Sequence, residues 1–261
     1  MILNTASLVF YGAARKVRSG HNNAIVAILL SMAQGVLFLA VFYLMFTILG
    51  QRGMAIRGNY LLYLLTGIFA YLTHIQSVSA VMGAENATSP MMQHAPMNTL
   101  VSILSAALST LYIKVISLGI ILFFIHTLFE PISFQYWPGA LGMFLLSWAS
   151  GCTVGLVFMA LAPWRPELIN IIKMVYIRAN MIASGKMFVA NMLPSALVAL
   201  FDWNPLFHII DQARGFTFVN YAPHYSNWQY PVYAALVLLV IGMMGENYTR
   251  KHISASWSAK Y

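Results

Sequence analysis

The chain has 261 residues, of which 60% are hydrophobic and only 8% charged, and its mean hydropathy is +0.74. A soluble domain carries about 25% charged residues, so this composition excludes an ordinary soluble enzyme or binding domain and indicates an integral membrane protein. The net charge of +8 is then expected to reflect Lys and Arg retained on the cytoplasmic side of a membrane, not nucleic-acid binding.

Residues 1–23 precede the first long apolar stretch and form a segment of their own. Apolar and small residues recur there at helical spacing, namely Leu3, Ser7, Phe10, Ala14 and Val17, and basic residues follow at positions 15, 16 and 18. The pattern predicts a cytoplasmic helix that lies in the membrane interface. A cytoplasmic tail without fixed structure is the alternative.

Residues 24–261 are expected to form a single all-α domain of six membrane-spanning helices. A bilayer core about 30 Å thick needs about 20 apolar residues in a helix. Five stretches reach this length, and a sixth, shorter one is bounded by aromatic and basic residues. The predicted spans are Ala24–Leu49, Tyr60–Val81, Leu100–Phe129, Trp137–Ala162, Glu167–Phe188 and Tyr230–Glu246. Lys and Arg cluster before the first span and after the last, which favours cytoplasmic termini.

Residues 84–98 join the second and third predicted spans on the expected cytoplasmic side. Ser89-Pro90 suits the start of a short helix and Pro96 its end. Such a helix would expose Met91, Met92 and His94, an adaptable contact surface for a partner. A solvent-exposed loop without a role is the alternative.

Three basic residues fall within the predicted spans: Lys114 in the third, and Lys173 and Arg178 in the fifth. The six acidic residues lie at span ends or in loops, so these cations have no acidic partner at their own depth. An unpaired cation in the bilayer costs at least about 2.5 kcal/mol, and a water-filled lumen or a passing anion is expected to compensate. Snorkelling of Lys173 toward the interface is an alternative.

The fifth predicted span also carries a polar stripe. At about 100° per residue, four of its polar residues fall within a sector about 80° wide, and Arg178 borders that sector. The four residues are Asn170, Lys173, Asn180 and Ser184. A polar stripe on an otherwise apolar helix is the pattern expected for the wall of a translocation pathway.

Residues 189–228 are apolar enough for lipid but cannot form one continuous helix, because Pro194 and Pro205 interrupt them. They also carry groups that are costly against hydrocarbon, namely Asp202, His208, Asp211 and Arg214. Broken backbone is tolerated at membrane depth only where protein or water surrounds it. We therefore expect a helical hairpin that re-enters the periplasmic face between spans five and six. Asp211 and Arg214 are expected to pair and hold it; contact with the transported molecule is the alternative.

The sequence offers little for catalysis. It contains no G-x-x-x-x-G-K-[ST] nucleotide-binding loop, no His or Cys cluster at metal-ligand spacing, and no convincing nucleophile set. We therefore expect that the chain is not an enzyme and binds no cofactor or metal itself. Gly151 and Gly155 form a G-x-x-x-G pattern, which allows close helix packing but is common in membrane helices.

Three passages form patterns typical of a known family. The first runs from Gly67-Ile68-Phe69 through Ser79-Ala80-Val81 to Glu85-Asn86 and Ala95-Pro96-Met97-Asn98. The second is Ser184-Gly185-Lys186-Met187-Phe188 with Leu193-Pro194. The third and most specific is Trp203-Asn204-Pro205-Leu206-Phe207-His208, followed by Asp211 and Arg214. Together these passages resemble the permease subunit of bacterial polysaccharide-exporting ABC transporters of the capsule-export type, among the ABC-2 exporters. The resemblance covers about residues 60–250, and residues 15–34 depart from the family motif.

The resemblance implies a homodimeric permease in the bacterial inner membrane, bound to two copies of a separate cytosolic ATPase that holds the ATP and Mg. It implies a short coupling helix at about residues 84–98, whose contacts would come from Glu85, Asn86, Met91, Met92, His94 and Pro96. It also implies a periplasmic gate formed by Trp203, Asn204, Pro205, His208, Asp211 and Arg214. A lipid-linked polysaccharide would leave past this gate toward a periplasmic co-polymerase and an outer-membrane channel.

The unpaired basic residues favour an acidic, capsular polysaccharide as the cargo. The pathway would then include Lys114, Asn170, Lys173, Arg178, Asn180 and Ser184. Other interpretations stay open: an ABC-2 permease for another amphiphile, such as teichoic acid, O-antigen, a lipid or a drug; a membrane scaffold that transports nothing; and, more distantly, an intramembrane enzyme.

Overall fold

The structure is a computed structural model that describes residues 2–19, 23–48, 56, 58–84 and 99–252. Within these ranges every regular element is a helix, which confirms the expected all-α fold. The elements are α1 (Ile2–Ser19), α2 (Ala24–Ile48), α3 (Tyr60–Met82), α5 (Thr99–Leu128), α6 (Trp137–Leu161), α7 (Pro166–Ala183), the short 3-10 helix η1 (Ala190–Met192), α8 (Ser195–Phe201), α9 (Pro205–Thr217) and α10 (Gln229–His252).

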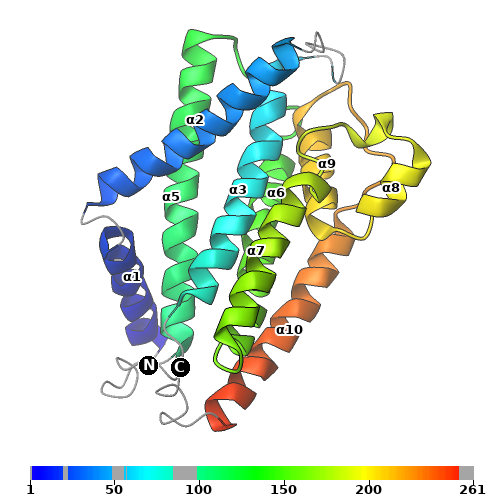
Figure 1. Cartoon of the computed structure of the whole chain (residues 1–261). Coiled ribbons are helices and arrows are strands. Elements are labelled where there is room, and N and C mark those ends of the chain that lie inside the picture. The colour runs from blue at the N-terminus through cyan, green and yellow to red at the C-terminus, as the bar shows by residue number, and fades with distance from the viewer. Residues whose placement is uncertain (1, 20–22, 49–55, 57, 85–98, 253–261) are drawn as a thin grey trace.

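The long helices run alternately up and down the bundle. As a result, α1 and the C-terminal end of α10 lie at one end, at the bottom of Figure 1, whereas α8 and α9 lie toward the other end. This order of helices agrees with the predicted placement of the hairpin away from the termini. Which end faces the cytoplasm stays a prediction.

Five of the described helices are long and apolar enough to cross a membrane: α2 over Ala24–Met45, α3, α5, α6 and α10. The fifth predicted span, Glu167–Phe188, is not among them. The helix there, α7, has 18 residues and includes Glu167, Lys173 and Arg178. It stops at Ala183, and Gly185 then adopts a φ of +72°, a conformation that favours glycine. A sixth span therefore stays a prediction.

Helix α3 lies at the centre of the bundle. In its most apolar stretch, 78% is buried inside the protein, whereas only 17% of the corresponding stretch of α10 is buried. The start of α3 is fixed by Asn59, whose Oδ1 accepts a hydrogen bond from the Leu62 N–H at 3.0 Å. The outer helices expose apolar side chains instead, as expected where helices meet lipid.

Gly151 and Gly155 allow α6 to pack closely on α3. A Cβ added at Gly151 would lie 2.4 Å from the carbonyl oxygen of His74, and one at Gly155 would lie 2.7 Å from that of Val78. Small residues four positions apart share one helix face and let two backbones approach. The G-x-x-x-G pattern thus marks the central helix contact of this fold.

Helix α1 confirms the helix predicted in the N-terminal segment. It packs against the first half of α5, where the Ser105 hydroxyl donates a hydrogen bond to the Val9 carbonyl at 3.2 Å and Gly12 faces the same serine. Packing against a neighbouring helix therefore holds α1 to the bundle. Its position in the membrane interface stays a prediction.

Candidate functional site

The predicted hairpin consists of η1, α8 and α9. Its Trp203–His208 motif covers the end of the turn after α8 and the first turn of α9. Asn204 caps α9, because its Oδ1 accepts a hydrogen bond from the Leu206 N–H at 3.0 Å. Its Nδ2 donates to Asn180 Oδ1 at 2.9 Å and to the Ala183 carbonyl at 3.0 Å. Pro205 occupies the first turn of α9, where a missing N–H costs nothing. The motif therefore ties the start of α9 to the end of α7.

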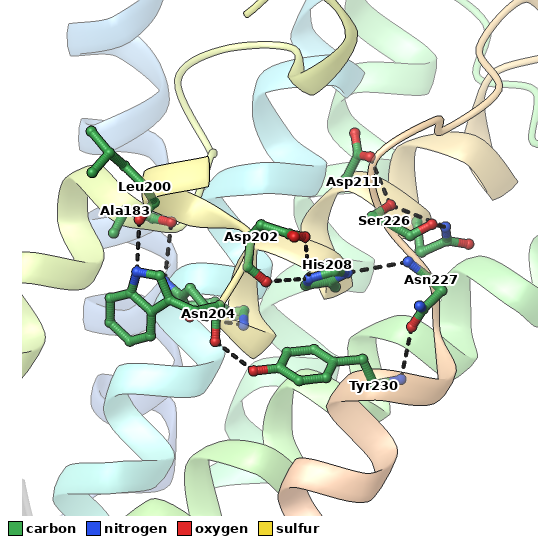
Figure 2. Close-up of polar contacts among 12 residues, drawn as sticks. Ala183, Leu200, Asp202, Asn204, His208, Asp211, Ser226, Asn227 and Tyr230 are labelled. Atoms are coloured by element: carbon green, nitrogen blue, oxygen red, sulfur yellow. Dashed lines mark hydrogen bonds and ion pairs between the residues drawn. The ribbon is translucent and has the colours of Figure 1, made fainter. Parts of the chain in front are cut away.

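His208 connects this turn with the segment that leads into α10 (Figure 2). Its Nδ1 accepts a hydrogen bond from the Asn227 N–H at 3.1 Å, so the proton of the neutral ring lies on Nε2. Nε2 donates to the Asp202 carbonyl at 2.6 Å and lies 3.2 Å from the Asp202 carboxylate. Tyr230 packs on the His208 ring and donates to the Trp203 carbonyl at 2.6 Å.

Trp203 differs from the other motif residues because its side chain is 67% exposed. Its indole N–H donates to the Leu200 carbonyl at 2.7 Å, which holds the ring against the last turn of α8. Of the predicted gate side chains, Trp203 is therefore exposed, whereas Asn204, His208, Asp211 and Arg214 are buried.

Asp211 and Arg214 do not pair as expected. Among the described residues no ion pair joins Asp211 to Arg214, and the acid–base contact found near them is the one between Asp202 and the His208 ring. The Asp211 carboxylate instead accepts hydrogen bonds from the Tyr221 hydroxyl and, at 2.7 Å, from the Ser226 hydroxyl. Burial and, second, the Asp211 carboxylate raise the pKa of Tyr221, so the phenol keeps the proton that it donates. Asp211 thus fixes the chain that follows α9.

Arg214 is only 1% exposed and fixes the chain that precedes α8. Its Nη1 donates to the carbonyls of Gly185 and Phe188 at 3.0 and 2.7 Å, and its Nη2 donates to that of Lys186 at 2.7 Å. The guanidinium also lies over the Tyr63 ring, 4.3 Å from its centre. Asp211 and Arg214 therefore both hold the hairpin, as expected, but through separate partners.

Two lysines are buried without a hydrogen-bond partner in the described part of the chain. Lys114 on α5 is 0% exposed, and its Nζ lies 5.7 Å from the centre of the Phe69 ring. Lys186, directly after α7, is 1% exposed. The burial of Lys186 was not predicted from the sequence.

The polar stripe of α7 divides into two groups. Asn180 and Ser184 are buried against the hairpin, whereas Lys173 is half-buried and Asn170 and Arg178 are exposed. Docking of the hairpin accounts for the buried group, and the exposed group leaves a polar face on the surface of the chain.

Lys114 is not brought to that polar face within one chain. Its helix α5 packs against α1, α2, α3 and α6, and α7 packs against α3 and α6. Helices α5 and α7 lie on different sides of α3 (Figure 1). A pathway that includes both groups would therefore need a surface outside a single chain.

Sequence reasoning missed a buried histidine at the centre of the bundle. His74 on α3 has Nδ1 3.0 Å from the Ser150 hydroxyl and Nε2 2.8 Å from the Tyr176 hydroxyl. The ring therefore joins α3 to α6 and α7. A lone histidine in an apolar span was the available signal, but the partners come from distant helices.

An apolar cavity of about 250 Å³ lies between α3, α5, α6 and α9. Its lining includes Leu65, Phe69, Trp137, Phe144 and Ala213. It offers few groups that could bind a sugar hydroxyl, so it suits a lipid chain and not a polysaccharide.

The predicted coupling residues cannot be placed. Glu85, Asn86, Met91, Met92, His94 and Pro96 all lie outside the described residues, and their role stays a prediction.

Two proteins called "Polysialic acid transport protein KpsM" from Escherichia coli align with the chain over 188 residues, at 24% and 23% identity. The aligned part is 69% of this chain and 70% of each relative. The chain is a distant relative of polysaccharide transport proteins. No protein-family model matches it.

This relationship supports the resemblance to capsule-export ABC permeases. With the five apolar helices, it indicates a multi-pass membrane protein that is similar to polysaccharide transport proteins. The relatives are transport proteins, which favours transport over catalysis.

Proposed function

We propose that this chain is the permease of an ATP-driven exporter that moves an acidic, lipid-linked capsular polysaccharide from the cytoplasm to the periplasm. The observation that carries the proposal is Lys114, a completely buried ammonium without a hydrogen-bond partner in the described residues. Structural lysines at such positions are paired or reach water. Lys114 has neither a partner nor contact with water in the described structure, which is explained if an anion or water reaches it during transport.

The exposed part of the α7 stripe supports the same conclusion. Lys173 and Arg178 lie on an accessible face, while α7 contributes apolar side chains such as Ile171 and Val175 beside them. In the proposed homodimer, two such faces and two copies of Lys114 would border the route of the polymer. The names of the two relatives refer to an acidic polymer, which fits cations along that route.

The other parts of the proposal follow from the family resemblance. Two copies of a cytosolic ATPase would bind the ATP and Mg and drive the permease through residues 84–98. The hairpin would form the periplasmic gate, with Trp203 exposed at its tip. The cytoplasmic placement of both termini, the inner membrane, the periplasmic co-polymerase and the outer-membrane channel belong to the same proposal.

Neutralising the cations tests the proposal. Lys114→Met together with Arg178→Gln should lower surface polysaccharide by about tenfold or more, because a hydrogen bond to a charged group contributes about 1.5–3 kcal/mol and about 1.4 kcal/mol is a factor of ten. The measurement is the amount of acidic glycan on cells that carry the complete export system, normalised to permease in the membrane.

Lys251→Met is the matched control, because Lys251 is exposed at the end of α10; it should leave export unchanged. A membrane scaffold predicts normal glycan in the double variant too, and that result would remove the pathway role of the cations. If the double variant stopped the export of a neutral amphiphile and left the acidic glycan unchanged, an exporter of another cargo would be favoured.

A separate prediction concerns the coupling segment. Glu85→Arg or Pro96→Ala should reduce co-purification of the ATPase with the permease, because each changes a residue of the proposed contact helix. The ATPase recovered per permease is the quantity to measure, with Glu246→Arg on α10 as the control. Unchanged recovery would place the ATPase contact elsewhere.

A further inference from the structure

Lys186 lies in a cage of aromatic rings. Its Nζ is 3.6 Å from the centre of the Tyr71 ring, 5.0 Å from that of Phe38 and 5.5 Å from that of Phe42. The side chain is 1% exposed, and its ammonium has no hydrogen-bond partner among the described residues. Ring faces attract cations, and the attraction grows when water is removed. The rings are therefore the interactions that keep the ammonium in this position.

The cage joins three parts of the molecule. Lys186 belongs to the segment that leads from α7 into the hairpin, Tyr71 lies on α3, and Phe38 and Phe42 lie on α2. Arg214 of α9 binds the backbone of the same segment through the carbonyls of residues 185, 186 and 188. The hairpin and this segment thus form one unit, and the Lys186 side chain extends from that unit to α2 and α3.

Gly67 brings this unit close to α3. A Cβ at Gly67 would lie 2.8 Å from Arg214 Nη2 and 3.0 Å from the Lys186 carbonyl oxygen. The backbone of the segment therefore rests directly on α3, and the lysine side chain continues past Tyr71 to the two phenylalanines.

The two basic residues of this unit are held in different ways. Three directed hydrogen bonds hold Arg214, and losing them would leave the carbonyls of Lys186 and Phe188 without the donors that Arg214 supplies. Lys186 makes no directed bond, and its ammonium would regain full hydration on leaving the cage. The Lys186 contact therefore opens far more readily than the Arg214 contact.

We propose that Lys186 and the rings of Tyr71, Phe38 and Phe42 form a reversible latch that closes the hairpin unit against α2 and α3. The proposal rests on the function proposed above only in taking the hairpin as the exit gate. Lys186 is a positioning residue in this role: it sets how often the gate opens. A passing acidic polymer or water would stabilise the released ammonium.

The opening can be measured by the labelling rate of a cysteine. Ser184 is two residues from Lys186 and 0% exposed, and its hydroxyl has no hydrogen-bond partner among the described residues. Cys152 is the single cysteine of the chain, so Ser184→Cys with Cys152→Ala gives one reporter. The probe is a membrane-impermeant maleimide, applied to the full-length permease in cells that lack an active ATPase.

The latch predicts different effects for substitutions of the ring and of the lysine. Tyr71→Leu removes the nearest ring and should raise the labelling rate about tenfold or more, because an unshielded ammonium is driven toward water. Lys186→Met keeps a side chain of similar volume but removes its charge. A protein usually tolerates the replacement of a buried charged side chain by an apolar one of similar volume. This variant should label no faster than the parent. In the Lys186→Met background, Tyr71→Leu should change the rate by less than about twofold.

Tyr71→Phe is the matched control. It keeps the ring and removes only the hydroxyl that donates to the Ile177 carbonyl at 3.2 Å, so the parental rate is expected. If Tyr71→Phe labels as fast as Tyr71→Leu, the hydroxyl and not the ring holds the segment. If Tyr71→Leu has the same effect with and without the lysine, the ring acts by packing; either result overturns the latch. Because labelling needs no transport, a failed export assay would count against the proposed function and not against the latch.

Discussion

Gly151→Ala is expected to disrupt the contact between α3 and α6 and to cause a large loss of stability. The new Cβ would lie 2.4 Å from the His74 carbonyl oxygen, 2.9 Å from the Ser77 Cβ and 3.0 Å from the His74 carbonyl carbon. Two of these atoms are backbone of the central helix, so neither can rotate away. The helices must therefore separate.

Separation of α6 from α3 would also affect the polar contacts beside Gly151. The adjacent Ser150 hydroxyl lies 3.0 Å from His74 Nδ1, and the Ser147 hydroxyl donates to the Ala70 carbonyl at 2.5 Å. Overpacking alone costs about 1–3 kcal/mol, and each weakened buried hydrogen bond adds about 1 kcal/mol. We expect Gly151→Ala to lower the midpoint of thermal unfolding of the purified permease by about 5–10 °C.

Gly142 provides the matched control on the same helix. A Cβ added there meets nothing within 4 Å, and alanine is the better helix former by about 0.5–1 kcal/mol. Gly142→Ala should therefore leave the midpoint unchanged or raise it slightly. Equal midpoints for the two alanine variants would show that α3 and α6 do not approach as closely as described.

Much of the fold could be predicted because it depends on local chemistry. Pro194 and Pro205 mark the starts of α8 and α9, since proline interrupts a helix but suits its first turn. The long apolar runs predicted the α2, α3, α5, α6 and α10 helices, because the length of an apolar run is also a local property of the sequence. The predicted fifth span extends past the end of α7, because the count of apolar residues beyond Ala183 took no account of the turn at Gly185.

The partners of buried polar groups could not be predicted in the same way. Asp211 and Arg214 are three residues apart, a spacing that favours pairing on a helix. Asp211 instead accepts hydrogen bonds from Tyr221 and Ser226. Arg214 donates to the carbonyls of residues 185, 186 and 188. These groups come close only after the loops on both sides of the hairpin fold back, which is tertiary information. Lys186 illustrates the same limit, because its cage comes from two distant helices.

Arg214→Lys is expected to detach the hairpin from the segment after α7, although it keeps the charge. The guanidinium reaches three carbonyls with two nitrogen atoms, at 2.7 to 3.0 Å. An ammonium is a compact point charge on a flexible stem and cannot reproduce this planar fork. Breaking the contacts of one buried charged group costs about 3–5 kcal/mol, which predicts a midpoint of thermal unfolding lower by about 10 °C.

The effect should be local at first, because Arg214 stabilises the hairpin and not the packing of the long helices. Arg214→Lys should therefore still insert into membranes, while the Ser184→Cys reporter becomes accessible to the maleimide. Arg250→Lys is the control, since Arg250 is exposed near the end of α10. A parental midpoint in Arg214→Lys would mean that the carbonyls of residues 185, 186 and 188 are satisfied without the fork. A low midpoint with a reporter cysteine that stays inaccessible would mean that Arg214 stabilises the bundle by its packing on Tyr63 and not by closing the hairpin.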